Sequence, residues 1–296
     1  MTELQVAING ILLGGLYLLM AQGLNLIFGV MRIVNFAHGI FIGISGLIVF
    51  SLFSDAGINP FIALPIVFIG MFAFGMLVQR VLLERVKGSG TQRELNTLLL
   101  TFGLSYILIN IGQEHWGSNP IAVPYLQGSI VIGSLRFVTA LVVAFFLAVL
   151  FSIVLYWWLG STTSGKSIRA TSQTEIGAEA CGINTRRART IAFGLGSGLA
   201  AAAGMLIILT QPIAPQTASN LTVICFVIIA LGGLGNYLGA AIGALILGLA
   251  SEFASFHLGT TWGVAVPYVF LILIMLLRPQ GLPSLLPGRA RKAVTL

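Results

Sequence analysis

Long runs of apolar residues follow one another along almost the whole chain, and no other feature limits its fold as strongly. A helix needs about 20 mostly apolar residues to cross the hydrocarbon core of a bilayer. Nine such segments can be distinguished: residues 4–30, 37–54, 60–79, 95–112, 136–158, 191–210, 221–235, 238–258 and 260–277. The seventh is short and ends in glycines, which indicates a half-span or a bent helix. The first is too long for the apolar core of a signal peptide, so we expect it to remain as a membrane helix.

The scarcity of charged residues excludes a water-soluble domain. Of the 296 residues, 57% are hydrophobic and only 8% are charged, whereas soluble domains carry about 25% charged residues. So few charges do not cover a water-facing surface of this size, and lipid must therefore surround most of the chain. In lipid the backbone polar groups need partners within the chain, and helices provide them. We predict an all-α polytopic membrane protein with eight or nine transmembrane helices, forming one domain over residues 1–296.

The basic residues predict the orientation of this domain. Lysines and arginines gather in the 80–94 loop, the 160–190 loop and the C-terminal tail, and only Arg136 lies on the opposite side. Loops rich in Lys and Arg stay in the cytoplasm. Nine crossings therefore place both loops and the C-terminus in the cytoplasm and the N-terminus outside. Because these few loops account for the net charge of +7, we expect no nucleic-acid partner.

The long polar stretch at 160–190 contains a predicted short helix. Ser172 stands three residues before Glu175, which is the spacing of a capping box. Gly182 follows where a helix C-terminus favours a left-handed residue. The pattern predicts a helix over 172–181 on the cytoplasmic face, and it leaves open whether this helix docks a partner or only sets the topology.

Residues 160–167, GSTTSGKS, match the P-loop pattern GxxxxGK[ST]. A working P-loop lies between a buried strand and a helix of a soluble α/β core. Here an apolar span precedes the motif, so we interpret the match as accidental. Lys166 is explained as a positively charged anchor at the cytoplasmic membrane surface.

Polar side chains within the apolar segments are candidates for a solute pathway. Gln22 and Asn25 are three residues apart and share a helix face. They and Asn110 are also explained by hydrogen bonding between helices. Glu252 favours a pathway role, because a carboxylate at membrane depth is costly and usually faces a cavity or a partner. His38 is either a pathway residue or a hydrogen-bonding group at a helix start.

The sequence contains no set of residues typical of an enzyme. The histidines are scattered without metal-ligand spacing, and Cys181 and Cys225 are spaced like neither a disulfide nor a metal site. Small residues repeat every four positions, which predicts close helix packing. These repeats are Gly10 and Gly14, Gly39 and Gly43, Gly194 and Gly198, and Gly235, Gly239 and Gly243.

Five segments, in order along the chain, resemble one family. They are IVNFAHG at 33–39, LERV at 83–86, IRA at 168–170 with Glu175, Ala178 and CGIN at 181–184, ALGGLGN at 230–236, and RPQG at 278–281. They are similar to the signatures of the permeases of branched-chain amino acid ABC importers, a group that includes permeases for urea and short amides. The chain departs from the family after Arg85, where KGSG at 87–90 replaces the usual aromatic-Arg-Pro run.

The resemblance implies a mechanism with several partners. A second related permease completes the pore, two cytoplasmic ATPases hold ATP and Mg²⁺, and an extracytoplasmic binding protein delivers the solute. No cofactor is expected in this chain. Residues 172–183 would form the coupling helix that docks on an ATPase, with Glu175, Ala178, Cys181, Gly182 and Ile183 as its coupling residues. The pathway candidates are Gln22, Asn25, Asn35, His38 and Glu252. By analogy we expect a type II-like bundle with an internal pseudo-repeat, in a bacterial plasma membrane.

Alternative functions remain open at this point. The solute is a branched-chain or other small amino acid by default, with urea, short amides and aromatic acids as alternatives within the family. The chain is otherwise a stand-alone secondary transporter, a class that usually carries ionisable coupling residues in mid-membrane. The single buried acid, Glu252, and the predicted docking helix favour the importer. The resemblance implies a heterodimer with a second, similar permease, and a homodimer remains open as the alternative.

Overall fold

The fold class predicted from the apolar segments is confirmed. The computed structural model describes residues 2–133 and 135–277. Over these residues eight helical segments are long and apolar enough to cross a membrane. Their helices are α1 (Glu3–Met31), α3 (Pro60–Val81), α4 (Gly90–Trp116), α5 (Thr139–Ser161), α8 (Thr185–Thr210), α9 (Ala218–Gly232), α10 (Tyr237–Leu258) and α11 (Thr260–Leu277).

The remaining elements are shorter. They are α2 (His38–Ser54), the 3-10 helices η1 (Leu83–Arg85) and η2 (Pro215–Thr217), the helices α6 (Thr163–Gln173) and α7 (Glu175–Ala180), and the strands β1 (Ser129–Ile132) and β2 (Leu135–Val138). The second predicted segment is thus a 17-residue helix. The seventh, expected to be a half-span or a bent helix, is the 15-residue α9.

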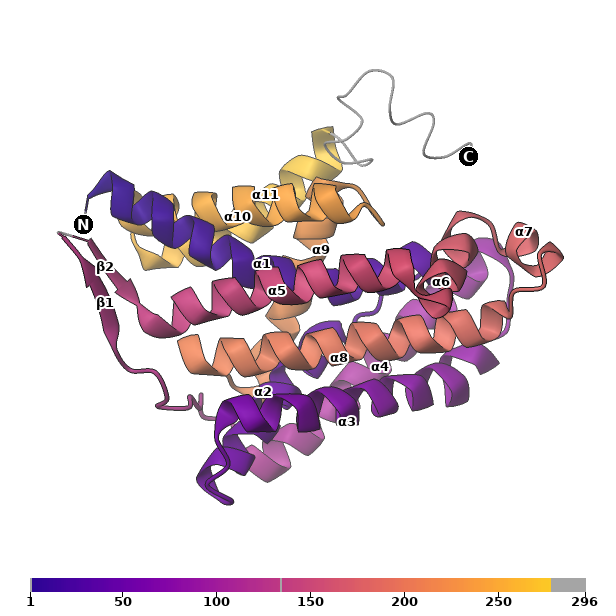
Figure 1. The fold of residues 1–296 in the computed structure, drawn as a ribbon, viewed down its shortest axis with the longest axis horizontal. Helices are drawn as coiled ribbons and strands as arrows, with labels where there is room; N and C mark the ends of the chain where they lie inside the picture. The colour runs from indigo at the N-terminus through magenta and orange to yellow at the C-terminus, as the bar shows by residue number, and fades with distance from the viewer. Residues whose placement is uncertain (1, 134, 278–296) are drawn as a thin grey trace.

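A β-hairpin that the sequence analysis did not predict lies beside the N-terminus (Figure 1). Strands β1 and β2 pair antiparallel, with Val131 opposite Arg136. The Gln5 side chain of α1 donates a 2.7 Å hydrogen bond to the carbonyl oxygen of Arg136. Helices α6 and α7 lie at the opposite end of the bundle (Figure 1). The hairpin and the α6–α7 region therefore mark the two ends of the molecule.

The described lysines and arginines other than Arg136 gather at the α6–α7 end. They lie on α6, on η1 and in the segment that follows it, at the ends of α1 and α3, and at the beginnings of α4 and α8. This distribution agrees with the predicted one-sided charge. The basic residues of the tail, and the RPQG motif at 278–281, lie outside the described residues.

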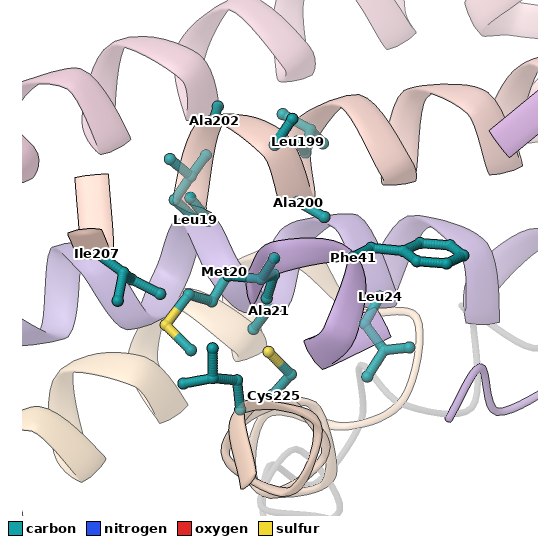
Figure 2. Packing of buried hydrophobic residues seen from close by; sticks show 14 of the residues in the cluster. Leu19, Met20, Ala21, Leu24, Phe41, Leu199, Ala200, Ala202, Ile207 and Cys225 are labelled. Carbon is teal, nitrogen blue, oxygen red and sulfur yellow. The ribbon is translucent and has the colours of Figure 1, made fainter. Parts of the chain in front are cut away.

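Helices α1 and α8 form the centre of the bundle. Helix α1 packs against α5, α8, α9 and α10, and α8 packs against α1, α2 and α3. The two helices cross where glycines meet, because a Cβ added at Gly196 would lie only 2.7 Å from the carbonyl oxygen of Gly23. Figure 2 shows the core that results, with Leu19 and Met20 of α1, Phe41 of α2, Ala200 of α8 and Cys225 of α9 gathered together.

The order and lengths of the helices repeat within the chain. The unit α1–α2–α3 has helices of 29, 17 and 22 residues. The unit α8–α9–α10 has helices of 26, 15 and 22 residues. Helix α1 begins at the hairpin end and α8 at the α6–α7 end, so the two units run in opposite directions (Figure 1). The last helix of each unit begins with an asparagine cap, Asn59 and Asn236. These features are those of an inverted repeat.

Candidate functional site

The connection between α1 and α2 returns deep into the bundle. Arg32 ends α1 in the left-handed conformation, with φ 56°, and the chain then runs back beside the helix. At the start of α2, the His38 ring nitrogen Nε2 lies 3.0 Å from the carbonyl oxygen of Met20. Met20 is roughly 16 Å along the helix axis from Met31, at 1.5 Å per residue. Helix α2 therefore begins within the bundle.

Helix α9 packs against the beginning of α2. The Gly39 N–H donates a 2.8 Å hydrogen bond to Thr222 Oγ1, and this hydroxyl donates to the carbonyl oxygen of Phe36 at 3.1 Å. Figure 2 views α9 end-on at Cys225, while α1 and α8 run across the view. The two short helices of the repeat thus meet at the centre of the bundle, where α9 is steeply inclined to its neighbours.

The loop after α9 is joined to α1. The Gly235 N–H donates a 2.9 Å hydrogen bond to Asn25 Oδ1, and a Cβ added at Gly29 would lie 3.6 Å from the Cα of Gly235. The motif ALGGLGN at 230–236 therefore contacts the end of α1. The motif IVNFAHG at 33–39 contacts the beginning of α9 at Thr222.

Four of the five pathway candidates are buried and hydrogen-bonded within the chain. Gln22 donates to Ser152 of α5 at 2.7 Å, and Asn35 Oδ1 accepts from the Ala37 N–H at 3.1 Å. Asn25 and His38 make the contacts described above, and none of the four is more than 5% exposed. In the described part of the chain, one further polar atom of each has no hydrogen-bond partner. These residues hold α1, α2, α5 and the 233–236 loop together. They line neither the cavity beside Arg32 and Thr97 nor the one beside Phe41 and Phe74.

Glu252 lies apart from the four buried candidates. It is half-buried on α10, more than a helical turn before Leu258, and within the described residues it makes no ion pair. Asn110 was expected to form a hydrogen bond between helices, and this expectation is wrong. Its side chain is exposed and donates to the carbonyl oxygen of Tyr106 in its own helix.

The predicted cytoplasmic helix is present with different bounds. Ser172 does not begin it, because Ser172 belongs to α6 and its hydroxyl donates to the carbonyl oxygen of Arg169. Thr174 has an extended backbone, with φ −154° and ψ 124°, and its hydroxyl accepts from the Gly177 N–H. Thr174 therefore ends α6 and caps α7, and the predicted 172–183 helix is divided at this residue.

The predicted end of this helix is correct. Gly182 has φ +76°, its N–H donates to the carbonyl oxygen of Glu179, and the Ile183 N–H donates to that of Ala178. Together these two bonds form a Schellman motif. Of the proposed coupling residues, Glu175, Cys181 and Gly182 are exposed, Ile183 is partly buried and Ala178 is buried.

Ile176 was not among the predicted coupling residues. This side chain is 81% exposed on α7, at the end of the bundle where the charged residues gather. Ile176 is the only large apolar side chain of α7, and the residues on either side of it in the sequence are Glu175 and Gly177. The signal in the sequence was a single large apolar residue within the polar stretch 171–182.

Residues 160–167 do not form a phosphate-binding loop. They cover the end of α5 and the first turns of α6, and Thr162 caps α6 by accepting from the Gly165 N–H at 3.0 Å. Gly165 allows this turn to pack against α5, because a Cβ there would lie 2.6 Å from the Cα of Leu159. Among residues 2–133 and 135–277, no group of three or more His, Cys, Asp or Glu side chains could hold a metal ion.

The sequence of the chain matches the family described as "Branched-chain amino acid transport system / permease component" over residues 6–276. The chain belongs to this family. The resemblance inferred from the five segments is thereby confirmed, and the chain is a transport permease. No solved structure matches this permease, so the type II-like architecture remains a prediction.

Curated relatives cover nearly the whole permease. The high-affinity branched-chain amino acid transport system permease protein LivH of Escherichia coli (strain K12) is 31% identical over 94% of each chain. The corresponding protein BraD of Pseudomonas aeruginosa is 27% identical over 94% of this chain and 95% of its own. A probable LivH of Methanocaldococcus jannaschii is 25% identical, over 95% and 92%.

Proposed function

We propose that this permease is a membrane-spanning subunit of an ATP-driven importer that moves branched-chain or other small amino acids across the plasma membrane by alternating access. Membership of the family carries the proposal. The solute class rests on the names of the relatives, which are branched-chain amino acid permeases. Urea, short amides and aromatic acids are the alternatives for the solute.

The docking element of this proposal is α7. It lies at the end of the bundle and presents Ile176 to solvent, with the exposed Glu175 beside it. An exposed apolar side chain surrounded by polar groups fits a pocket on a partner protein. The partner proposed for this surface is a cytoplasmic ATPase, which would hold the ATP and Mg²⁺. One ATPase binds this permease and another binds a second, related permease.

The charge distribution supports the orientation within this complex. The α6–α7 end carries the described basic residues other than Arg136, which favours the cytoplasmic side for this end. The N-terminus and the hairpin then face outward, where an extracytoplasmic binding protein delivers the solute. The C-terminal tail is cytoplasmic in this arrangement.

The central crossing of α2 and α9 is the element that rearranges during transport. In inverted-repeat transporters, broken helices at the repeat interface form the solute path. Gln22, Asn25, Asn35 and His38 each have one polar atom without a hydrogen-bond partner among the described residues. These atoms provide hydrogen-bonding groups for a second arrangement of the helices. Glu252 contributes a carboxylate at membrane depth that complements the ammonium group of an amino acid.

Purification of the complex tests the proposal. The permease is extracted from native membranes in mild detergent, and the proteins that copurify are identified by mass spectrometry. We expect an ATPase and a second permease, and we expect Ile176→Ser to reduce ATPase recovery about tenfold or more, as loss of an apolar anchor does. Ile130→Ser in the hairpin is the control. A permease that purifies alone and moves solute in liposomes without ATP would instead be a secondary transporter.

A further inference from the structure

Two arginines at the beginning of α8 form ion pairs in different directions. Arg189 pairs with Glu175, the first residue of α7, and Arg186 pairs with Glu84 of η1. Residues three apart lie on the same side of a helix. The same face at the beginning of α8 is therefore bound both to α7 and to η1.

Further contacts join α7 to α8. The Thr185 hydroxyl donates a 2.7 Å hydrogen bond to Glu179 Oε1. The Schellman motif closes the connection between the two helices by bonds from Gly182 and Ile183. Together, the Glu175–Arg189 ion pair and the Glu179–Thr185 hydrogen bond connect both ends of α7 to the beginning of α8.

Each ion pair joins one exposed group to one shielded group. The Arg189 side chain is 16% exposed and that of Glu175 is 47% exposed. The Glu84 side chain is 17% exposed and that of Arg186 is 66% exposed. A shielded charge that loses its partner is more costly than an exposed one, which water still solvates. Losing Glu175 or Arg186 should therefore do more harm than losing Arg189 or Glu84.

Helix α8 is placed to transmit movement from the cytoplasmic end. It has the highest buried share of the eight spans, and it packs against α1, α2 and α3. Gly204 of α8 packs on the backbone of α2 near Ile42, within the same short helix that meets α9. A displacement of the first turn of α8 therefore reaches the central crossing through one continuous helix.

We propose that Arg186 and Arg189 are positioning residues, which make α7 and η1 move together with α8 when the ATPases close. This inference rests on the proposed importer function. It assigns the LERV motif at 83–86 a role in transmission, because Glu84 is the residue through which the first cytoplasmic loop is bound to α8. In this proposal Ile176 makes the direct contact with the ATPase.

The inference is tested on the complete complex in proteoliposomes, by the number of leucine molecules transported for each ATP hydrolysed. Glu175→Gln and Arg186→Gln should lower this ratio about two- to fivefold, the range for a partly exposed ion pair. Arg189→Gln and Glu84→Gln should lower it less. ATPase recovery should stay at the wild-type amount in the Arg186, Arg189 and Glu84 variants, whose residues lie outside α7. Arg187→Gln is the matched control, because Arg187 is exposed between the two arginines and forms no ion pair with a described residue.

Reversal of each pair separates positioning from direct contact with the ATPase. The double variants Glu175→Arg/Arg189→Glu and Glu84→Arg/Arg186→Glu should restore the ratio toward the wild-type value. A wild-type ratio in all four single variants, or double variants that remain as impaired as the single ones, would overturn the inference. A wild-type complex that lacks an ATPase would contradict the proposed function instead.

Discussion

Gly39 and Thr222 determine how closely two helices approach at the centre of the bundle. The Thr222 hydroxyl accepts from the Gly39 N–H and donates to the carbonyl of Phe36, so one side chain satisfies two backbone groups. The sequence predicted the close packing at Gly39, since the four-residue repeat with Gly43 is local. It did not reveal the partner, because Thr222 is 183 residues away and nothing in a single sequence relates the two.

Replacing Gly39 tests this contact. A Cβ at Gly39 would meet the backbone of Ala218 and Thr222, and the backbone cannot give way as a flexible side chain does. We expect Gly39→Ala to lower the free energy of unfolding by about 1–3 kcal/mol, the usual cost of overpacking. Thermal unfolding in detergent measures it. Gly70→Ala is the control, since a Cβ there has no atom within 4 Å, and equal stability of the two variants would contradict the account.

Glu252 is the residue on which the solute path is easiest to test. If its carboxylate binds the ammonium group of the solute, Glu252→Gln removes a charge-assisted contact worth about 1.5–3 kcal/mol, which corresponds to a tenfold or greater loss of affinity. Uptake measured against leucine concentration should show this loss as a raised KM. The control is Glu114→Gln, at an exposed position near the end of α4. An unchanged KM would show that the Glu252 carboxylate does not bind the solute.

At the scale of elements, the sequence predicted the spans well and their irregular connections poorly. The apolar segments agree with the helices because the length of each run is set by the bilayer. The hairpin was missed, since its strands of four residues carry little pattern. The division between α6 and α7 was missed because Ser172 and Thr174 are both capping residue types. Only the backbone conformation decides which of them acts as the cap.

The left-handed conformation of Gly182, at the end of α7, can be tested by substitution. Gly182 is left-handed, with φ +76°, and a residue with a Cβ costs about 1–2 kcal/mol in this region. Gly182→Ala should loosen the turn and reduce ATPase recovery, measured by copurification. Gly182→Asn should retain most of it, because Asn tolerates the left-handed region. Similar recoveries for the Ala and Asn variants would show that backbone conformation is not the cause.

At the scale of the whole molecule, the bundle combines an inverted repeat with basic residues gathered at one end. Two units of three helices run in opposite directions (Figure 1). The described basic residues other than Arg136 gather at the end where the second unit begins. The one-sided charge was predictable from the loops alone. The repeat was expected only by analogy with the family, because the two units share helix lengths and order more clearly than residues.

The two cysteines report the orientation of the molecule. Cys181 is exposed at the α7 end and Cys225 is buried in α9. With the α7 end in the cytoplasm, a membrane-impermeant maleimide should label the permease in inverted membrane vesicles and leave it unlabelled in intact cells. Cys181→Ser should abolish the labelling. Labelling of Cys181 in intact cells would reverse the proposed topology.

The central claim is that this permease moves its solute only when a partner hydrolyses ATP. The most direct measurement is uptake of radiolabelled leucine by proteoliposomes that contain the purified complex and the binding protein, with and without ATP on the cytoplasmic side. The account predicts uptake that requires ATP and is abolished by Ile176→Asp, a change that leaves the spans intact. Uptake that proceeds at the same rate without ATP would contradict it.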